Sequence, residues 1–227
     1  MKLRIASLSL LAVCLILAAI PAMAQEIVYE NGPPNGQVDA WTINFGFAVS
    51  DTFEVCCHEG HGGPATQTTI NEISFAAWVE PGDTASSVEL AIGSTGFFSN
   101  NLFDETVSLT QSSCSTNNFG FNVCTETGDF NGPALNNGND FLTLENATTV
   151  EGNPLYWDEN SGVGCMSMGC PSAAQENTLG TIPSEAFTLN GFVSSSTTGT
   201  TPEPSTILLF GSGLLGLTGM LRHKIKR

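Results

Sequence analysis

The distribution of positive charge constrains this chain more than any other feature of its sequence. All six lysine and arginine residues lie near the two ends, and none occurs between residues 5 and 221. Of the 22 acidic residues, all but Glu203 fall within residues 25–201. That span cannot form salt bridges to lysine or arginine, and it has no such cations to displace the counterions of nucleic-acid phosphates. Nucleic-acid binding by residues 25–201 is therefore excluded.

Residues 1–24 have the organisation of a secretory signal peptide. Two basic residues precede an uncharged apolar run over 5–20, which a proline then ends. Small residues follow at the two positions that a signal peptidase reads, so we expect cleavage by that enzyme before residue 25. A retained N-terminal anchor is the alternative interpretation. The predicted cleavage site consists of Ala22, Ala24 and Gln25.

Export changes the interpretation of the cysteines. Six remain after residue 24, and an even number outside the cytoplasm favours disulfides. A Cys114–Cys124 bond would close a hairpin-sized loop, and a Cys165–Cys170 bond would close a shorter one. The neighbouring Cys56 and Cys57 rarely bond to each other, which leaves open whether one pairs elsewhere or binds a metal. The disulfide candidates are Cys56, Cys57, Cys114, Cys124, Cys165 and Cys170.

Residues 194–227 predict a membrane-associated tail. A Ser/Thr-rich linker over 194–201 precedes a segment, 205–221, that we expect to be a transmembrane helix. Its uncharged core, 207–221, would rise about 22 Å as a helix, which is short of the roughly 30 Å hydrocarbon core unless its neighbours extend it. By the positive-inside rule, the basic residues that follow would stay on the cytoplasmic side of the inner membrane and place residues 25–201 outside. These basic residues are Arg222, Lys224, Lys226 and Arg227.

Three parts of this tail occur in a recognisable order: Pro202-Glu203-Pro204, the apolar segment and the basic cluster. Together, residues 202–227 resemble the PEP-CTERM sorting signal. The resemblance implies that a membrane protease-transpeptidase, the exosortase, recognises the tail and cleaves it near Pro202, Glu203 and Pro204. It also implies an origin in bacteria that make exopolysaccharide and biofilm. A plain tail anchor is the alternative for this segment.

The middle of the chain predicts one all-β domain over residues 25–193. Apolar and polar residues alternate over 38–49, 73–79 and 88–92, as in half-buried strands. Shorter candidates are 105–111, 118–125, 141–145 and 186–193, and turn residues separate them. Seven or eight short strands without a helical period favour a β-sandwich or jelly-roll-like domain.

Two clusters could bind a soft metal. Cys56, Cys57, His58 and His61 offer the thiol and imidazole groups that zinc or copper prefers. A polar loop with oxidised cysteines is the competing interpretation. The stretch from Cys165 to Cys170 contains two methionines and would suit Cu(I), or it forms a disulfide-closed surface loop.

Calcium is a further hypothesis. Residues 129–140 are rich in Asp and Asn, whose oxygens suit Ca²⁺, although the same residues also form ordinary β-turns.

Catalysis has little support, and we expect this chain not to be an enzyme. There is no G-x-S-x-G motif, and His58 and His61 are the only histidines between residues 25 and 201. Trp157, which precedes two carboxylates, could form a platform for a sugar ring or could lie in the core. We expect an exported structural or adhesive protein of the cell surface or matrix, in contact with exopolysaccharide. The alternatives are a metal-binding module and a carbohydrate-binding or glycoside-active protein.

Overall fold

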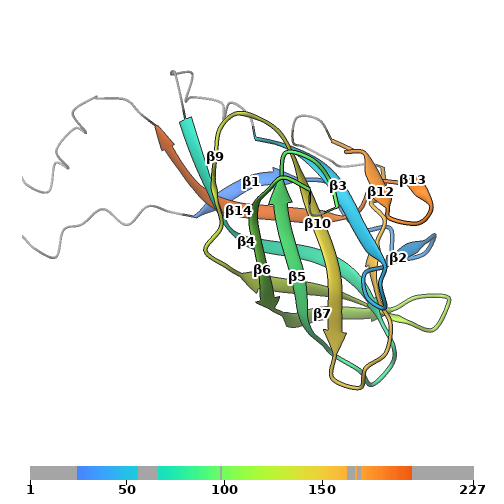
Figure 1. Cartoon of the computed structure of the whole chain (residues 1–227). Coiled ribbons are helices and arrows are strands. Elements are labelled where there is room, and N and C mark those ends of the chain that lie inside the picture. The colour runs from blue at the N-terminus through green and yellow to red at the C-terminus, as the bar shows by residue number, and fades with distance from the viewer. Residues whose placement is uncertain (1–24, 56–65, 98, 163–166, 168–169, 196–227) are drawn as a thin grey trace, which may run out of the picture. The chain divides into compact units, whose positions relative to one another are not determined.

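A computed structural model of the chain describes residues 25–55, 66–97, 99–162, 167 and 170–195. These residues form an all-β domain of two antiparallel sheets, as the sequence predicts, and they contain no helix. Figure 1 shows the two layers, with the strands of the second sheet running across those of the first. In the described part of the chain no helix is therefore long and apolar enough to cross a membrane.

The first sheet is organised around one long strand, β4, which has partners along both edges. On one edge it pairs with β14 and β11, which continue to β1 and β2; on the other it pairs with β8 and β9, and β8 continues to β7. The strands are β1 (Glu26–Glu30), β2 (Ala40–Thr42), β4 (Thr66–Val79), β7 (Thr110–Thr116), β8 (Asn122–Asp129), β9 (Ala134–Leu135), β11 (Leu155–Asp158) and β14 (Phe187–Ser195).

The second sheet has the order β13-β12-β3-β10-β5-β6. One central pair is long and regular: β10 pairs with β3 from Gly138↔Val55 to Glu145↔Ala48. The strands are β3 (Ala48–Val55), β5 (Ala85–Gly93), β6 (Asn101–Ser108), β10 (Gly138–Thr149), β12 (Ala174–Glu176) and β13 (Gly180–Ile182).

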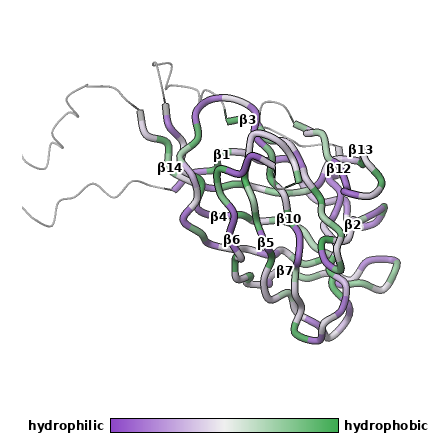
Figure 2. Tube along the Cα trace, in the orientation of Figure 1, coloured by the Kyte–Doolittle hydropathy of each residue, from purple (hydrophilic) through white to green (hydrophobic). Residues whose placement is uncertain are grey.

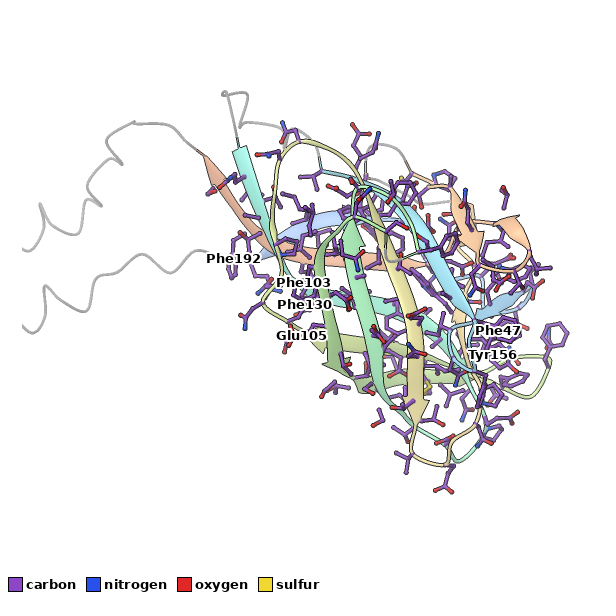
Figure 3. All side chains as sticks on the ribbon, in the orientation of Figure 1. Phe47, Phe103, Glu105, Phe130, Tyr156 and Phe192 are labelled. Carbon is purple, nitrogen blue, oxygen red and sulfur yellow. A yellow bond between two sulfur atoms is a disulfide. The ribbon has the colours of Figure 1, made fainter. Side chains whose placement is uncertain are left out.

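The hydrophobic core lies between the two sheets because alternate side chains of each strand face inward. Val88, Leu90 and Ile92 of β5 are completely buried, as their spacing predicts. Along the strands, Figure 2 shows hydrophobic segments interspersed with hydrophilic ones. Near one edge of the sandwich, Phe103 of β6 packs against Phe130, with ring centroids 5.2 Å apart, and Figure 3 shows both.

The prediction of one continuous strand over 38–49 is wrong. A turn separates β2 from β3, because Phe45 and Gly46 adopt left-handed backbone angles with φ of 56° and 89°. Phe45 is consequently 65% exposed instead of facing the core. The segment 105–111 is also divided, between β6 and β7.

Strand β14 continues to Ser195, so the first two residues of the predicted linker belong to the sheet. The predicted signal peptide, the remainder of the linker, the sorting motif and the segment 205–221 lie outside the described residues. Gln25, the residue predicted to follow the signal cleavage site, is exposed, and its side-chain amide donates hydrogen bonds to Asn71 and Glu72.

Candidate functional site

Four aromatic side chains gather on the outer surface of the first sheet, and we call them the aromatic face: Trp78, Phe119, Phe121 and Tyr156. Trp78 of β4 and Tyr156 of β11 are directly paired, so their side chains emerge on the same side. Because Ala77 and Val79 of β4 are completely buried, that side is the one away from the core. Figure 3 shows Tyr156 at the end of the sandwich away from Phe192.

The turn between β7 and β8 places the two phenylalanines over Trp78. The Phe119 ring stacks on the Trp78 ring at 5.5 Å with an interplanar angle of 25°, and Phe121 lies 5.7 Å from the same ring. Phe119 is 61% exposed, whereas Trp78 is buried beneath it. The aromatic face therefore presents one exposed ring supported by a buried one.

Hydrogen bonds within this turn hold the phenylalanines in place. The Asn117 side-chain oxygen accepts the backbone N–H groups of Phe119 and Phe121, each at 3.0 Å. The N–H of Asn118 donates to the Gln37 side chain at 3.0 Å, which ties the turn to the segment before β2. The aromatic face is thus pre-organised, and a ligand would order few groups on binding.

Two carboxylates follow Tyr156 in the chain, and the first of them, Asp158, contacts the aromatic face. Asp158 is buried and accepts hydrogen bonds from Trp78 Nε1 at 2.7 Å and from the Gly36 N–H at 2.8 Å. Burial raises the pKa of Asp158 to about 7, although these two donors oppose the shift. Glu159 accepts weaker bonds from Trp41 Nε1 and Asn35, each at 3.3 Å, and burial also raises its pKa.

A second group of polar side chains, which we call the polar hub, lies at the junction of the two sheets and consists of two buried residues and two half-buried serines: Asn31, Asp51, Ser172 and Ser184. Asp51 of β3 accepts the Ser172 hydroxyl at 2.5 Å and the Glu185 N–H at 2.8 Å. Burial raises the pKa of Asp51 to about 6 despite these bonds.

Glu185 adjoins the polar hub and is completely buried. Neither of its carboxylate oxygens has a hydrogen-bond partner among the described residues. Burial, together with repulsion from Asp51, Glu159 and Asp158, raises the pKa of Glu185 well above its ordinary value. This environment favours the protonated form of the Glu185 carboxyl group over the charged form.

Trp157, the candidate sugar platform, lies in the core and is 0% exposed. Its ring packs between Phe75 and Phe187 at 6.0 Å and 5.6 Å, and its Nε1 donates to the Ala186 carbonyl at 3.0 Å. The interpretation of Trp157 as a sugar platform is wrong because no face of the ring reaches solvent. The side chains of Tyr156, on the same strand, and of Trp78, on the neighbouring strand β4, point to the outer side instead, where Phe119 covers Trp78.

One predicted disulfide is present. Cys114 of β7 and Cys124 of β8 are bonded with an S–S distance of 2.03 Å, and the bond crosses the hairpin beside the aromatic face. Cys170 is also disulfide-bonded. The candidates Cys56, Cys57 and Cys165 lie outside the described residues.

The candidate metal ligands His58 and His61 lie outside the described residues as well. In the parts of the chain that the structure does describe, no three His, Cys, Asp or Glu side chains are grouped so that they could hold a metal ion. The oxygen-rich segment 129–140 is divided among the end of β8, the short strand β9 and the start of β10.

Neither the aromatic face nor the polar hub was among the sites predicted from the sequence. A signal for the former exists: Trp78 falls on the polar side of the alternation over 73–79, where a tryptophan is unusual. No comparable signal exists for the polar hub, because its four residues come from separate segments of the chain.

Comparison with known proteins supports the interpretation of the tail. A family model of the PEP-CTERM protein-sorting motif matches residues 200–224, and no curated protein matches the chain. The chain therefore carries a PEP-CTERM sorting motif. This motif implies export, anchoring of the C-terminal segment in a membrane, and processing by the exosortase.

Proposed function

We propose that this chain is a structural or adhesive protein of the cell surface or matrix, which binds polysaccharide through its aromatic face. The observation that carries the proposal is the exposed Phe119 ring, stacked on Trp78 beside Tyr156. Aromatic rings offer flat apolar surfaces, and the neighbouring Asn, Gln and Glu side chains offer hydrogen-bond groups for hydroxyls. Sorting by the exosortase then leaves the domain outside the cell.

Charge favours a polysaccharide that is not strongly anionic. Residues 25–201 contain no lysine or arginine, so the surface lacks the cations that recognise carboxylate or sulfate groups. Burial is the main cause of the raised pKa of the Tyr156 phenol, and the negative charge of the nearby Glu80 raises it further. A neutral sugar polymer fits this surface better than an acidic one.

Affinity electrophoresis in gels containing extracellular polysaccharide tests the proposal. We expect the purified protein to be retarded and the Phe119→Ala variant to lose about tenfold in affinity, as for the truncation of an interface anchor. Phe45→Ala is the matched control, because Phe45 lies on a different turn and is about as exposed as Phe119. Equal retardation of both variants, or none of the parent protein, would refute binding through the aromatic face.

The sorting step is tested separately. Replacement of Pro202, Glu203 and Pro204 by alanine removes the residues near which the exosortase is expected to cleave. We expect the altered chain to keep its apolar tail and to remain in the membrane fraction, whereas the parent chain loses residues after the cleavage site. Intact mass of the two products measures this, and identical products would contradict exosortase processing at this motif.

A further inference from the structure

A small cavity lies on the outer side of the first sheet, and none of the four residues of the aromatic face lines it. It has a volume of about 120 Å³ and is open to solvent. Ser74 and Ala76 of β4 lie on this side, because Phe75 between them faces the core. The segment between β1 and β2 contributes Gly32 and Pro34. The cavity is therefore bounded by the sheet and by a second segment of the chain.

Backbone hydrogen bonds fix that second segment in place. The Asn31 N–H, just before it, donates to the Phe187 carbonyl at 2.9 Å. Within it, the Pro33 carbonyl accepts the Ser161 N–H, also at 2.9 Å. The cavity therefore keeps its shape without a ligand, and a ligand would order few groups on binding.

Three residues with a hydroxyl group line the cavity: Ser74, Thr125 and Thr188. Ser74 is directly paired with Thr188 of β14, and Thr125 of β8 is directly paired with Ala76. Directly opposed side chains lie about 5 Å apart and diagonal neighbours about 7–8 Å, so one small ring can reach all three hydroxyls. Within the described part of the chain, the structure shows no hydrogen bond to any of these hydroxyls. They are therefore available to a ligand.

The size and chemistry of the cavity favour an uncharged ring. No charged side chain is among the described residues that line it. A hydroxyl both donates and accepts hydrogen bonds, and Ala76 and Pro34 add apolar surface. Since an engineered cavity of about 150 Å³ accommodates benzene, one six-membered ring fits here when part of it extends into solvent. A ring that carries hydroxyls and also has an apolar face is a sugar.

We propose that this cavity binds one uncharged hexose ring and is a second subsite for the polysaccharide that contacts the aromatic face. The second part of this statement rests on the proposed function, and the first part does not. Ala76 and Trp78 are two residues apart on the same side of β4, which separates them by about 7 Å along the strand. A single polymer chain can therefore reach both subsites.

Titration of the purified full-length protein with D-glucose, D-galactose and D-mannose, each alone, tests the cavity directly. The measurement is the NMR shift of backbone amides in nitrogen-15-labelled protein. We expect at least one hexose to shift the amides of Ser74, Thr125 and Thr188 with a Kd in the millimolar range, because a single ring makes few contacts. If none of the three sugars shifted these amides up to about 100 mM, well above that Kd, the inference would be overturned.

A double variant identifies the hydroxyls that bind the sugar. Thr125→Val with Thr188→Val removes two hydroxyls and keeps the shape, and valine is a good strand former, so the sheet should stay folded. We expect hexose affinity to fall about tenfold. Thr127→Val is the matched control, because Thr127 lies on the same side of β8, opposite Ser74, but does not line the cavity. Unchanged affinity in the double variant, or an equal loss in the control, would contradict binding in the cavity.

Affinity electrophoresis of the same double variant distinguishes this inference from the proposed function. We expect its affinity for the polysaccharide to fall about threefold, because a subsite is lost while the aromatic face remains. Normal retardation of both the parent and the double variant would overturn the second subsite and leave the proposed function standing. Absence of retardation in the parent, together with hexose shifts at the cavity, would refute the proposed function and leave only the hexose site.

Discussion

Asp83 and Glu126 show two opposite ways in which this domain holds a buried carboxyl group. Asp83, in the turn before β5, accepts the N–H groups of Thr84 and Glu151 at 2.7 Å and 2.9 Å and the Asn153 amide at 3.0 Å. Burial alone would raise the pKa of Asp83, yet the Thr149 side chain and these donors lower it to about 2. Asp83 therefore stays ionised.

Glu126 of β8 has no such donors. It pairs with Phe75 and shares the core face of the first sheet, and both of its oxygens lack a hydrogen-bond partner among the described residues. Burial alone raises the pKa of Glu126 to about 7. The comparison teaches that, in a domain without lysine or arginine, backbone and amide donors decide whether a buried carboxyl group is charged.

The largest consequence is an unusual dependence of stability on pH. Asp51, Glu126 and Asp158 have pKa values of about 6, 7 and 7 in the folded state, above the ordinary values of 3.8 to 4.5. They bind protons more tightly folded than unfolded, so their contribution is complete below about pH 4 and is lost as pH rises through 6 to 7. We expect the free energy of unfolding to fall by several kcal/mol between pH 5 and pH 8.

Urea unfolding followed by tryptophan fluorescence measures this profile. Repulsion among surface carboxylates acts in the same direction, but salt screens it, whereas salt hardly affects buried groups. The fall should therefore persist in high salt. A stability that rises from pH 5 to pH 8 would contradict the assignment of these groups as protonated on folding.

Glu126→Met isolates one of these groups. A pKa near 7 instead of 4.5 corresponds to a loss of about 3 kcal/mol at high pH, at about 1.4 kcal/mol per pKa unit. The variant should be more stable than the parent at pH 8 by up to about that amount and nearly equal to it at pH 4. Glu126→Gln provides an uncharged control of the same shape. If Glu126→Met were less stable than the parent at pH 8, the Glu126 carboxylate would have to make stabilising interactions that the structure does not show.

Trp78→Phe tests the intermediate case, Asp158, which has two donors. The change removes the Nε1–H that donates to Asp158 Oδ1 at 2.7 Å. We expect the free energy of unfolding to fall by about 2 kcal/mol at pH 8, where the carboxylate is ionised, and by less at pH 5. Trp41→Phe, which removes the longer 3.3 Å bond to Glu159, should have less effect and is the control. An equal loss at both pH values would indicate packing alone.

Asp83→Asn should have the smallest effect and the opposite pH dependence. The folded pKa of Asp83 is depressed to about 2 from 3.8, so its contribution is present above about pH 4 and is lost as pH falls toward 2. We expect a loss of about 1 kcal/mol at neutral pH that disappears near pH 2. Differential scanning calorimetry at several pH values measures it. If the loss of stability in Asp83→Asn grew as the pH fell, the pH dependence would have the opposite sign, and the contrast between Asp83 and Glu126 would be contradicted.

Sequence reasoning predicted the elements whose signals are local. The β-sandwich class, the buried side of β5 and the Cys114–Cys124 bond followed from alternation and spacing, and the tail followed from a contiguous motif. The turn at Phe45 was missed because the apolar residues around it are spaced as in a strand. The strand is interrupted only by the positive φ of Phe45 and Gly46, which the apolar spacing does not indicate.

The sites were harder because they depend on pairing between distant segments. Tyr156 reaches Trp78 only through the β4–β11 register, and Asn31 reaches Ser184 only because the first and last strands pair. Trp157 and Tyr156 are neighbours in sequence, and which of them faces solvent depends on that same register. Neither relation leaves a pattern within any one segment.

The arrangement around β4 has a consequence for how the chain acquires its structure during secretion. The partners of β4 come from residues 122–129, 134–135, 155–157 and 187–195, and β1 pairs only with β14 within the described part of the chain. A chain that emerges from a translocon in N-to-C order therefore presents β1 and β4 long before their neighbours arrive. Strand pairing in the first sheet is complete only after β14 has passed through the translocon. The chain therefore remains unfolded enough for translocation until most of the domain is outside the cell.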